Sequence, residues 1–194
     1  MDKKLLITGF EPFGELTENS SWMAVAALPD KIGCYSLHKL LIPTVYGDGA
    51  NAVLEAAKSL NPDLILCIGV AVGRSAVTPE RIGVNIRDAR MPDNTGNQPR
   101  GKFVVPGAPA AYFATVPVDQ IADAVAAAGI PATVSNSAGA FVCNDVLFTL
   151  LHHFDGTATK VGFIHIPALP GQADKNMPLS QSTDGLIAAI ASLK

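Results

Sequence analysis

Cys143 has the residue type and the position that suit a nucleophile. It falls in residues 135–145, a Ser/Asn/Gly-rich joint between an apolar run at 130–134, which predicts a strand, and a helix predicted from the apolar spacing over 142–154. The first turn of a helix offers unpaired backbone N–H groups and the positive end of the helix dipole, so we expect the thiol to lose its proton more easily there. The alternative is a small buried apolar residue, which is what most free cysteines are.

A nucleophilic cysteine needs a base, usually histidine, and a third group that orients the base. His165 is the candidate base because it lies near the carboxyl end of a strand-like run, where Cys143 should also be. His152 and His153 lie roughly 13–15 Å from Cys143 along the predicted helix axis, too far to touch its thiol. His38 sits in an alternating run and is expected to face solvent or to be a satisfied core residue. A hydrogen-bonded core residue is also the alternative interpretation of His165.

Charged residues in the predicted loops are candidates for the remaining roles. Glu80, Asp88 and Asp93 could each orient a histidine, and periodicity does not distinguish among them. Arg74 and Arg90 could stabilise an oxyanion or could only pair with acidic residues. The sequence has no GxGxxG, P-loop, HExxH or GxSxG motif, so nucleotide binding, zinc-protease chemistry and serine-hydrolase chemistry lack support.

These side chains must be positioned by an α/β framework. Strand-like apolar runs alternate with helical patterns along the first part of the chain, which predicts a largely parallel sheet with helices on both faces. Sites in such sheets form beyond the carboxyl ends of the strands, so the loops after Ile7, Ile68, Val134 and Ile164 are expected to meet. The predicted strands are 4–9, 35–42, 64–69, 80–86, 130–134 and 161–167, and the predicted helices are 19–28, 51–60, 117–128, 142–154 and 184–193.

Two predicted loops have unusual compositions. Phe10 and Phe13 follow the first strand, and loops seldom expose such large apolar groups without a reason, so they either line a pocket or fold under the loop into the core. Residues 88–99 are polar and rich in turn formers, and long loops in compact domains are usually functional or mobile.

The composition excludes several classes of function. The 194 residues are 48% hydrophobic and 16% charged with a formal net charge of -3, which predicts one globular domain, residues 1–194, that binds neither nucleic acid nor an anionic membrane. The apolar run near the N-terminus is too short for a signal peptide, and no stretch is long enough to span a bilayer. The three cysteines form no CxxC pattern, so we expect no disulfide framework, no metal or other cofactor, and a cytoplasmic location.

Five segments of the chain together match the pattern of one known family. They are Thr8–Gly14, Glu80–Asn85, Asp88–Asn94, Ser135–Asn144 and Phe163–Pro167. In order and spacing they resemble the pyroglutamyl peptidase I (pyrrolidone-carboxylate peptidase) family across nearly the whole chain. The resemblance implies a single-domain α/β/α sandwich with a twisted, mixed, mostly parallel sheet. It also implies a cysteine exopeptidase that removes N-terminal pyroglutamyl residues from peptides, and a homo-oligomer, either a tetramer or a dimer.

The same resemblance implies roles for individual residues. Cys143 would be the nucleophile, His165 its base and Glu80 the group that orients the histidine. Arg90 would assist at the oxyanion, beside the backbone N–H of the cysteine. Loss of Cys143 should then abolish turnover, whereas loss of Glu80 should leave a weaker enzyme, because Glu80 orients and does not react.

The implied substrate pocket is apolar. The rings of Phe10, Phe13 and Phe141 would enclose the pyrrolidone ring, with Val70 and Val142 also at the substrate. A pyroglutamyl residue has no charged amino group, because its nitrogen is part of a lactam, so its pocket should be apolar with a few backbone donors and acceptors. Such a pocket penalises an unpaired ammonium group heavily and thereby excludes ordinary N-termini.

Val70 and Val72 depart from the family pattern, in which many members have Gln or Leu at the first position and glycine at the second. These changes leave open a related cysteine amidase or acyl transferase that acts on another cyclic acyl group. A non-catalytic binding relative is the remaining alternative, and the presence of Cys143, His165 and Glu80 argues against it.

Overall fold

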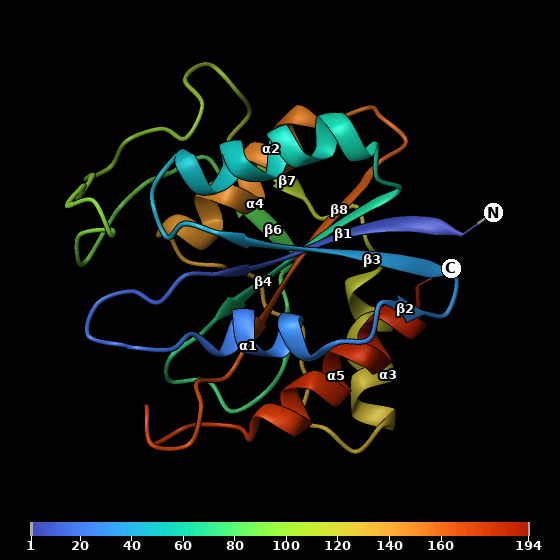
Figure 1. The fold of residues 1–194 in the computed structure, drawn as a ribbon. Coiled ribbons are helices and arrows are strands. Elements are labelled where there is room, and N and C mark those ends of the chain that lie inside the picture. Colours follow the sequence, from blue (N-terminus) through green and yellow to red (C-terminus); the bar gives the residue numbers. More distant parts are fainter. Residues whose placement is uncertain (1, 194) are drawn as a thin grey trace.

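The computed structural model, which describes residues 2–193, is built around a six-stranded sheet (Figure 1). The strands are β1 (Lys3–Phe10), β2 (Lys31–Ile32), β3 (Tyr35–Ile42), β4 (Leu64–Val70), β5 (Thr78–Pro79), β6 (Ile82–Val84), β7 (Ala111–Phe113) and β8 (Lys160–Ile166). The order in the sheet is β2-β3-β1-β4-β8-β5, and β6 pairs separately with β7. Strands β3, β1, β4 and β8 are parallel, whereas the edge strands β2 and β5 are antiparallel to their neighbours.

Helices cover both faces of the sheet (Figure 1). They are α1 (Ser20–Ala27), α2 (Asp48–Leu60), α3 (Val118–Ala127), α4 (Val142–His153) and α5 (Leu179–Ala191). The α2 and α4 helices lie on one face, and α1, α3 and α5 lie on the other. This arrangement confirms the predicted α/β/α fold with a mixed, mostly parallel sheet.

Successive residues of the central strands enter two separate cores. Leu5 of β1 and Leu66 of β4 join the core beneath α1, α3 and α5, whereas Leu6 and Cys67 join the core beneath α2 and α4. A strand that is buried on both faces has no solvent-facing positions, so these strands are continuous apolar runs in the sequence. Cys67 is completely buried and belongs to the core.

The structure differs from two of the predicted strands. Residues 130–134 form no strand; Ala132 forms an isolated bridge with Val77, and Ser135 just beyond them forms one with Glu80. In this parallel pairing Pro79 lacks the backbone N–H that would donate to the Thr133 carbonyl, so this edge of the sheet stays irregular. The strand predicted at 80–86 is shortened to β6, and Ile86 beyond it is exposed.

Gly9 near the end of β1 allows helix α1 to cross the strand closely. A Cβ atom at this position would lie 2.5 Å from the Cα atom and 2.7 Å from the backbone nitrogen of Trp22. Gly9→Ala must therefore displace backbone, and we expect it to cost about 1–3 kcal/mol of stability. Thermal unfolding followed by circular dichroism should show a melting temperature lower by roughly 2–4 °C for each kcal/mol. An unchanged melting temperature would show that α1 can move away at no cost.

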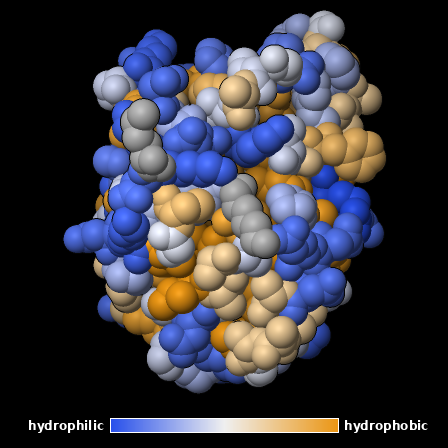
Figure 2. Space-filling view, turned by 90° about the vertical axis from the view of Figure 1, so that its right-hand side faces the viewer, coloured by the Kyte–Doolittle hydropathy of each residue, from blue (hydrophilic) through white to orange (hydrophobic). Residues whose placement is uncertain are grey.

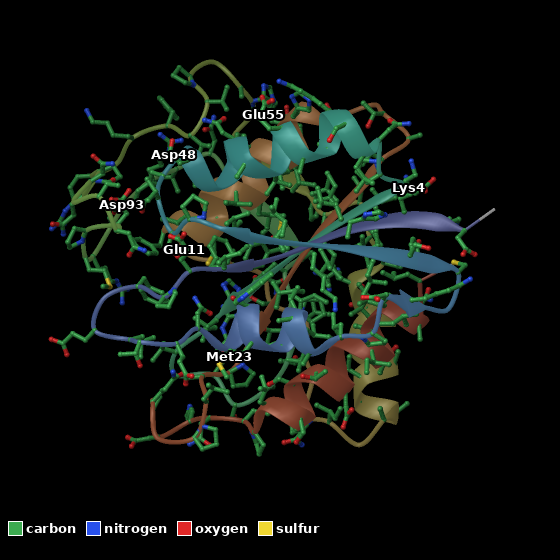
Figure 3. The ribbon with its side chains drawn as sticks, viewed as in Figure 1. Lys4, Glu11, Met23, Asp48, Glu55 and Asp93 are labelled. Atoms are coloured by element: carbon green, nitrogen blue, oxygen red, sulfur yellow. The ribbon has the colours of Figure 1, made fainter. Side chains whose placement is uncertain are left out.

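The two ends of the central strands lie on opposite sides of the molecule (Figure 3). Figure 3 labels Lys4 at the amino end of β1, and it labels Glu11 just beyond the carboxyl end with Asp93 on the same side of the molecule. Figure 2 shows the face at the amino end, where hydrophilic residues surround smaller apolar areas.

Within residues 2–193, no helix has both the length and the apolar character that crossing a bilayer requires.

Candidate active site

A cavity of about 940 Å³ lies at the carboxyl ends of the parallel strands. Its walls come from segments that follow β1, β4 and the irregular edge at 130–134, together with the end of β8, so the loops predicted to meet do meet. Cys143, His165 and Arg90 all line this cavity. Among residues 2–193, no group of three or more His, Cys, Asp or Glu side chains is placed to hold a metal ion.

Cys143 is the second residue of α4 and is partly exposed. The first four N–H groups of a helix have no partner within the helix, so the backbone N–H of Cys143 is available to a ligand in the cavity. The side chain of the next residue, Asn144, fixes this end of α4, since its Oδ1 accepts from the Val84 N–H at 2.9 Å and its Nδ2 donates to the Val84 and Ile86 carbonyls at 2.8 and 3.0 Å. The nucleophile candidate is therefore held by α4 and β6 together.

The expectation that Cys143 loses its proton easily is wrong, because the surroundings of the thiol raise its pKa. Burial, together with the negative charge of Glu80, raises the pKa of the Cys143 thiol to about 12. The backbone N–H at the start of α4 and the charge of Arg74 act in the opposite direction but are outweighed. A thiol with this pKa is protonated at neutral pH, so it could act as a nucleophile only after a base had removed its proton.

His165 and Glu80 form a buried pair. Thr78 of β5 pairs with His165 of β8, and the Glu80 N–H donates to the Phe163 carbonyl at 2.9 Å, so the strand pairing brings the two side chains together. The ring Nδ1 of His165 lies 2.7 Å from Oε1 of Glu80, and the Glu80 side chain is 0% exposed. The ring forms no hydrogen bond to Cys143 within the described residues, and such contacts commonly tighten only when substrate binds.

Glu80 remains ionised in this setting. Burial alone would raise the pKa of Glu80, but the hydrogen bond from His165, the charge of His165 when it is protonated and the hydrogen bond from Arg74 lower it. A carboxylate can only accept, so His165 carries its proton on Nδ1 and leaves Nε2 free. That is the tautomer a general base requires.

Arg90 lies on the 88–99 loop, which Asp93 holds in shape. Oδ1 of Asp93 accepts from the backbone N–H groups of Thr95 and Asn97, both at 2.9 Å, and Oδ2 accepts from the Tyr46 N–H at 3.0 Å. Burial would raise the pKa of Asp93, but these hydrogen bonds outweigh burial and lower it. Asp93 is therefore a structural residue of this loop, and it does not contact His165.

We expect Asp93→Asn to destabilise the protein by about 1.5–3 kcal/mol at neutral pH, because an amide group would face backbone donors. The folded-state pKa of Asp93 is lowered, so its contribution is present above the ordinary pKa of aspartate and is lost as the pH falls through the folded value. Urea unfolding of wild type and variant should therefore converge toward acidic pH. The exposed Asp155→Asn is the matched control. A difference that stays constant down to acidic pH would contradict this role.

Aromatic side chains form one wall of the cavity. Phe10 and Phe13 line it together with Phe141, and the ring centroids of Phe13 and Phe141 are 6.2 Å apart. Tyr46 supports Phe141 from behind in an edge-on contact at 5.5 Å, and its hydroxyl donates to the Ala140 carbonyl at 3.1 Å. Phe10 is the last residue of β1 and not part of the predicted turn, and it is only 2% exposed with its ring 6.1 Å from that of Phe163, so it borders the cavity from within the core.

The two predicted valine positions differ from one another. Val70 ends β4 and lines the cavity. Val142 is completely buried in the core beneath α4, and its side chain is not part of the cavity wall. The Val142 side chain therefore packs in the core, and the expectation that Val142 lies at the substrate stays a prediction. Val72 is 57% exposed on the cavity rim.

The remaining candidates have other environments. His38 is exposed on β3, and His152 of α4 lies 2.9 Å from the Tyr112 hydroxyl. Arg74 forms an ion pair with Glu80 at 2.7 Å. Of the two alternatives considered for Arg74, the structure therefore shows pairing with an acidic residue, and this pair lies inside the site. Sequence reasoning missed the support that Tyr46 gives to Phe141, because no local pattern joins these two residues.

Comparisons with known proteins identify relatives of this chain. The family model described as pyroglutamyl peptidase matches residues 3–193. A pyrrolidone-carboxylate peptidase of Escherichia fergusonii is 47% identical over 174 residues, which cover 88% of this chain and 81% of that protein. A pyrrolidone-carboxylate peptidase of Staphylococcus saprophyticus is 43% identical over 98% of this chain and 92% of its own length.

Solved structures give the same result. The crystal structure of Bacillus amyloliquefaciens pyroglutamyl peptidase I superposes with a TM-score of 0.95 at 39% identity, covering 99% of this chain and 97% of that one. A mutant pyrrolidone carboxyl peptidase from Pyrococcus furiosus superposes with a TM-score of 0.91 at 37% identity, covering 98% of this chain and 97% of that one. The match of sequence and fold over nearly the full length shows that this chain belongs to the pyroglutamyl peptidase family.

Proposed function

We propose that this chain is a cysteine exopeptidase that removes N-terminal pyroglutamyl residues from peptides through a thioester acyl-enzyme. The observation that carries the proposal is one cavity that contains the Cys143 thiol, a histidine paired with a buried carboxylate, and an aromatic wall. The family relationship supports the same reaction.

In the proposed mechanism, Nε2 of His165 accepts the thiol proton while the sulfur of Cys143 attacks the pyroglutamyl carbonyl carbon. The Glu80 carboxylate stabilises the imidazolium that forms, as its 2.7 Å contact to Nδ1 favours. The backbone N–H of Cys143 and the guanidinium of Arg90 stabilise the oxyanion. The imidazolium then gives its proton to the leaving amine, and water hydrolyses the thioester with His165 again as base.

The pocket chemistry supports selection of the lactam. Phe10, Phe13 and Phe141 provide apolar walls, and a pyroglutamyl ring brings no charge that would need a partner there. An ordinary N-terminus would bring an ammonium group, whose burial without a partner is costly. Val70 adds a further apolar group at the end of β4.

Release of a fluorogenic amine from a pyroglutamyl amide tests the proposal, with the prolyl and glutaminyl amides of the same amine beside it. Turnover of the pyroglutamyl compound alone is the expected result. Turnover of a different cyclic acyl amide would favour a related amidase, and Val70→Gln and Val72→Gly would be the first variants to compare. Folded, reduced protein without turnover of any of them would contradict the proposal.

We further propose that residues 1–194 act as one peptidase domain in the cytoplasm and assemble as a homotetramer or homodimer. Cys34, Cys67 and Cys143 are all free, which fits a reducing compartment. Phe103 and Phe113 are 66% and 69% exposed, and large exposed apolar side chains are typical of contact surfaces. Light scattering on the purified protein should give a mass above that of one chain, and a monomer at all concentrations would contradict the assembly.

A further inference from the structure

Arg74 connects three separate segments of the site. Its backbone N–H donates to the Ala71 carbonyl at 3.1 Å, and Gly73 before it has a φ of 92°, so a tight turn after β4 directs the arginine back toward the sheet. Nη1 then donates to Oε1 of Glu80 and to Oγ1 of Thr78, both at 2.7 Å. Nη2 donates to the Ser137 carbonyl at 3.0 Å, in the joint that precedes Cys143.

Arg74 and His165 share the compensation of the Glu80 carboxylate. Oε1 of Glu80 is shared by Arg74 and the ring Nδ1 of His165, whereas Oε2 is buried without a hydrogen-bond partner in the described structure. A buried carboxylate needs compensation, and His165 supplies a charge only when it is protonated, whereas the Arg74 guanidinium is charged at all relevant pH values. Among the described residues, Arg74 is the arginine or lysine that forms an ion pair with Glu80.

The planar guanidinium also fixes orientation. Its two nitrogens donate in different directions, to the carboxylate and to the joint, so the distance between Glu80 and Ser137 is set by one rigid group. Thr78, the other acceptor of Nη1, donates its hydroxyl to the His165 carbonyl at 3.3 Å. A shift of Arg74 would therefore move the acid, the base and the segment leading to the nucleophile relative to one another.

We propose that Arg74 is a positioning residue of the peptidase reaction, which holds the Glu80 carboxylate charged and aligned with His165 and tethers the joint before Cys143. The proposal rests on the function proposed above, since it takes Glu80 and His165 as the orienting acid and the base. It assigns Arg74 no contact with the reacting atoms, so its effect should appear in kcat and in the pH profile and not in substrate affinity.

The test compares Arg74→Met and Arg74→Lys with wild type on the pyroglutamyl amide. Arg74→Met should lower kcat on the order of 10²-fold with little change in KM, since misplacement of catalytic groups by about 1 Å has that effect. The acid limb of its kcat/KM profile should also lie at higher pH than that of wild type. The reason is that loss of a neighbouring positive charge favours proton binding by the pair of Glu80 and His165.

Arg74→Lys separates charge from position. It keeps a positive charge near Glu80 but cannot reproduce the fork that reaches both Glu80 and Ser137. The acid side of its profile should stay close to wild type while kcat recovers only in part. Lys58→Met, which removes a cation from an exposed helix pair at 65% exposure, is the control and should match wild type.

The outcomes are distinct. Arg74→Met with wild-type kcat and an unmoved pH profile would overturn the proposal, as would a change confined to KM. If Arg74→Met does not fold, Arg74→Lys decides, because full kcat in that variant would overturn the positional role. Proton NMR of the His165 Nδ1–H resonance gives a readout without turnover. It should persist to lower pH in wild type than in Arg74→Met, and this comparison remains valid even if wild type fails to hydrolyse the pyroglutamyl amide.

Discussion

Cys143→Ala should reduce turnover of a pyroglutamyl amide by roughly 10⁴–10⁶-fold, because removal of the nucleophile of a concerted set leaves only the oxyanion and binding contributions. The variant should fold normally, since Cys143 is partly exposed and alanine is smaller. Its affinity for a non-hydrolysed pyroglutamyl ligand should be close to that of wild type. Steady-state kinetics and calorimetric titration measure these two quantities.

Cys34→Ala is the matched control for this prediction, because Cys34 is a free cysteine that is exposed on the turn between β2 and β3. It should have wild-type kinetics. Turnover by Cys143→Ala within tenfold of wild type would contradict the proposed nucleophile, and equal losses in both variants would point to a general effect of thiol removal.

His165→Gln should lower kcat by roughly 10²–10⁴-fold, the usual contribution of a general acid–base group. The thiol has a pKa of about 12, so without a base it stays protonated at neutral pH. The residual rate of the variant should therefore rise steeply with pH, in contrast to the flatter wild-type profile. Rate measurements from neutral to alkaline pH test this difference.

Glu80→Gln and His38→Gln complete that comparison. Glu80→Gln should lose less of its kcat than His165→Gln, because Glu80 acts through the histidine. Both variants should lose more of their kcat than His38→Gln, since the His38 side chain is exposed on β3. A loss from His38→Gln as large as that from His165→Gln would contradict the assignment of the base. A wild-type rate in Glu80→Gln would show that the 2.7 Å pair has no part in the reaction.

Much of the fold follows from local patterns. The predicted strand at 35–42 is β3, because β-rich composition and bounding turns are local properties. The predicted helix from 142 is α4, which ends one residue earlier at His153. The strand at 130–134 fails because its pairing depends on a partner segment far away in the sequence, in which Pro79 has no N–H to donate to the Thr133 carbonyl. Asn19 caps α1, since its Oδ1 accepts from the Ser21 N–H at 3.0 Å.

The site was less accessible to sequence reasoning than the fold. The position of Cys143 in the first turn of α4 marks it as a candidate nucleophile. The direction of its pKa shift depends on its burial and on its nearness to Glu80, and both are tertiary properties. Periodicity left Glu80 equivalent to Asp93, and only the family resemblance separated them. The pairing of Arg74 with Glu80 depends on a turn at Gly73 that no period reveals.

Covalent labelling with a pyroglutamyl diazomethyl ketone tests the central claim most directly, because this reagent carries the proposed acyl group and traps the attacking thiol. Peptide mapping by mass spectrometry should show one adduct per chain, located on Cys143, that forms in step with loss of activity and is slowed by a pyroglutamyl peptide. An adduct on Cys34 or Cys67 with Cys143 unmodified, or inactivation without any labelled thiol, would contradict the account.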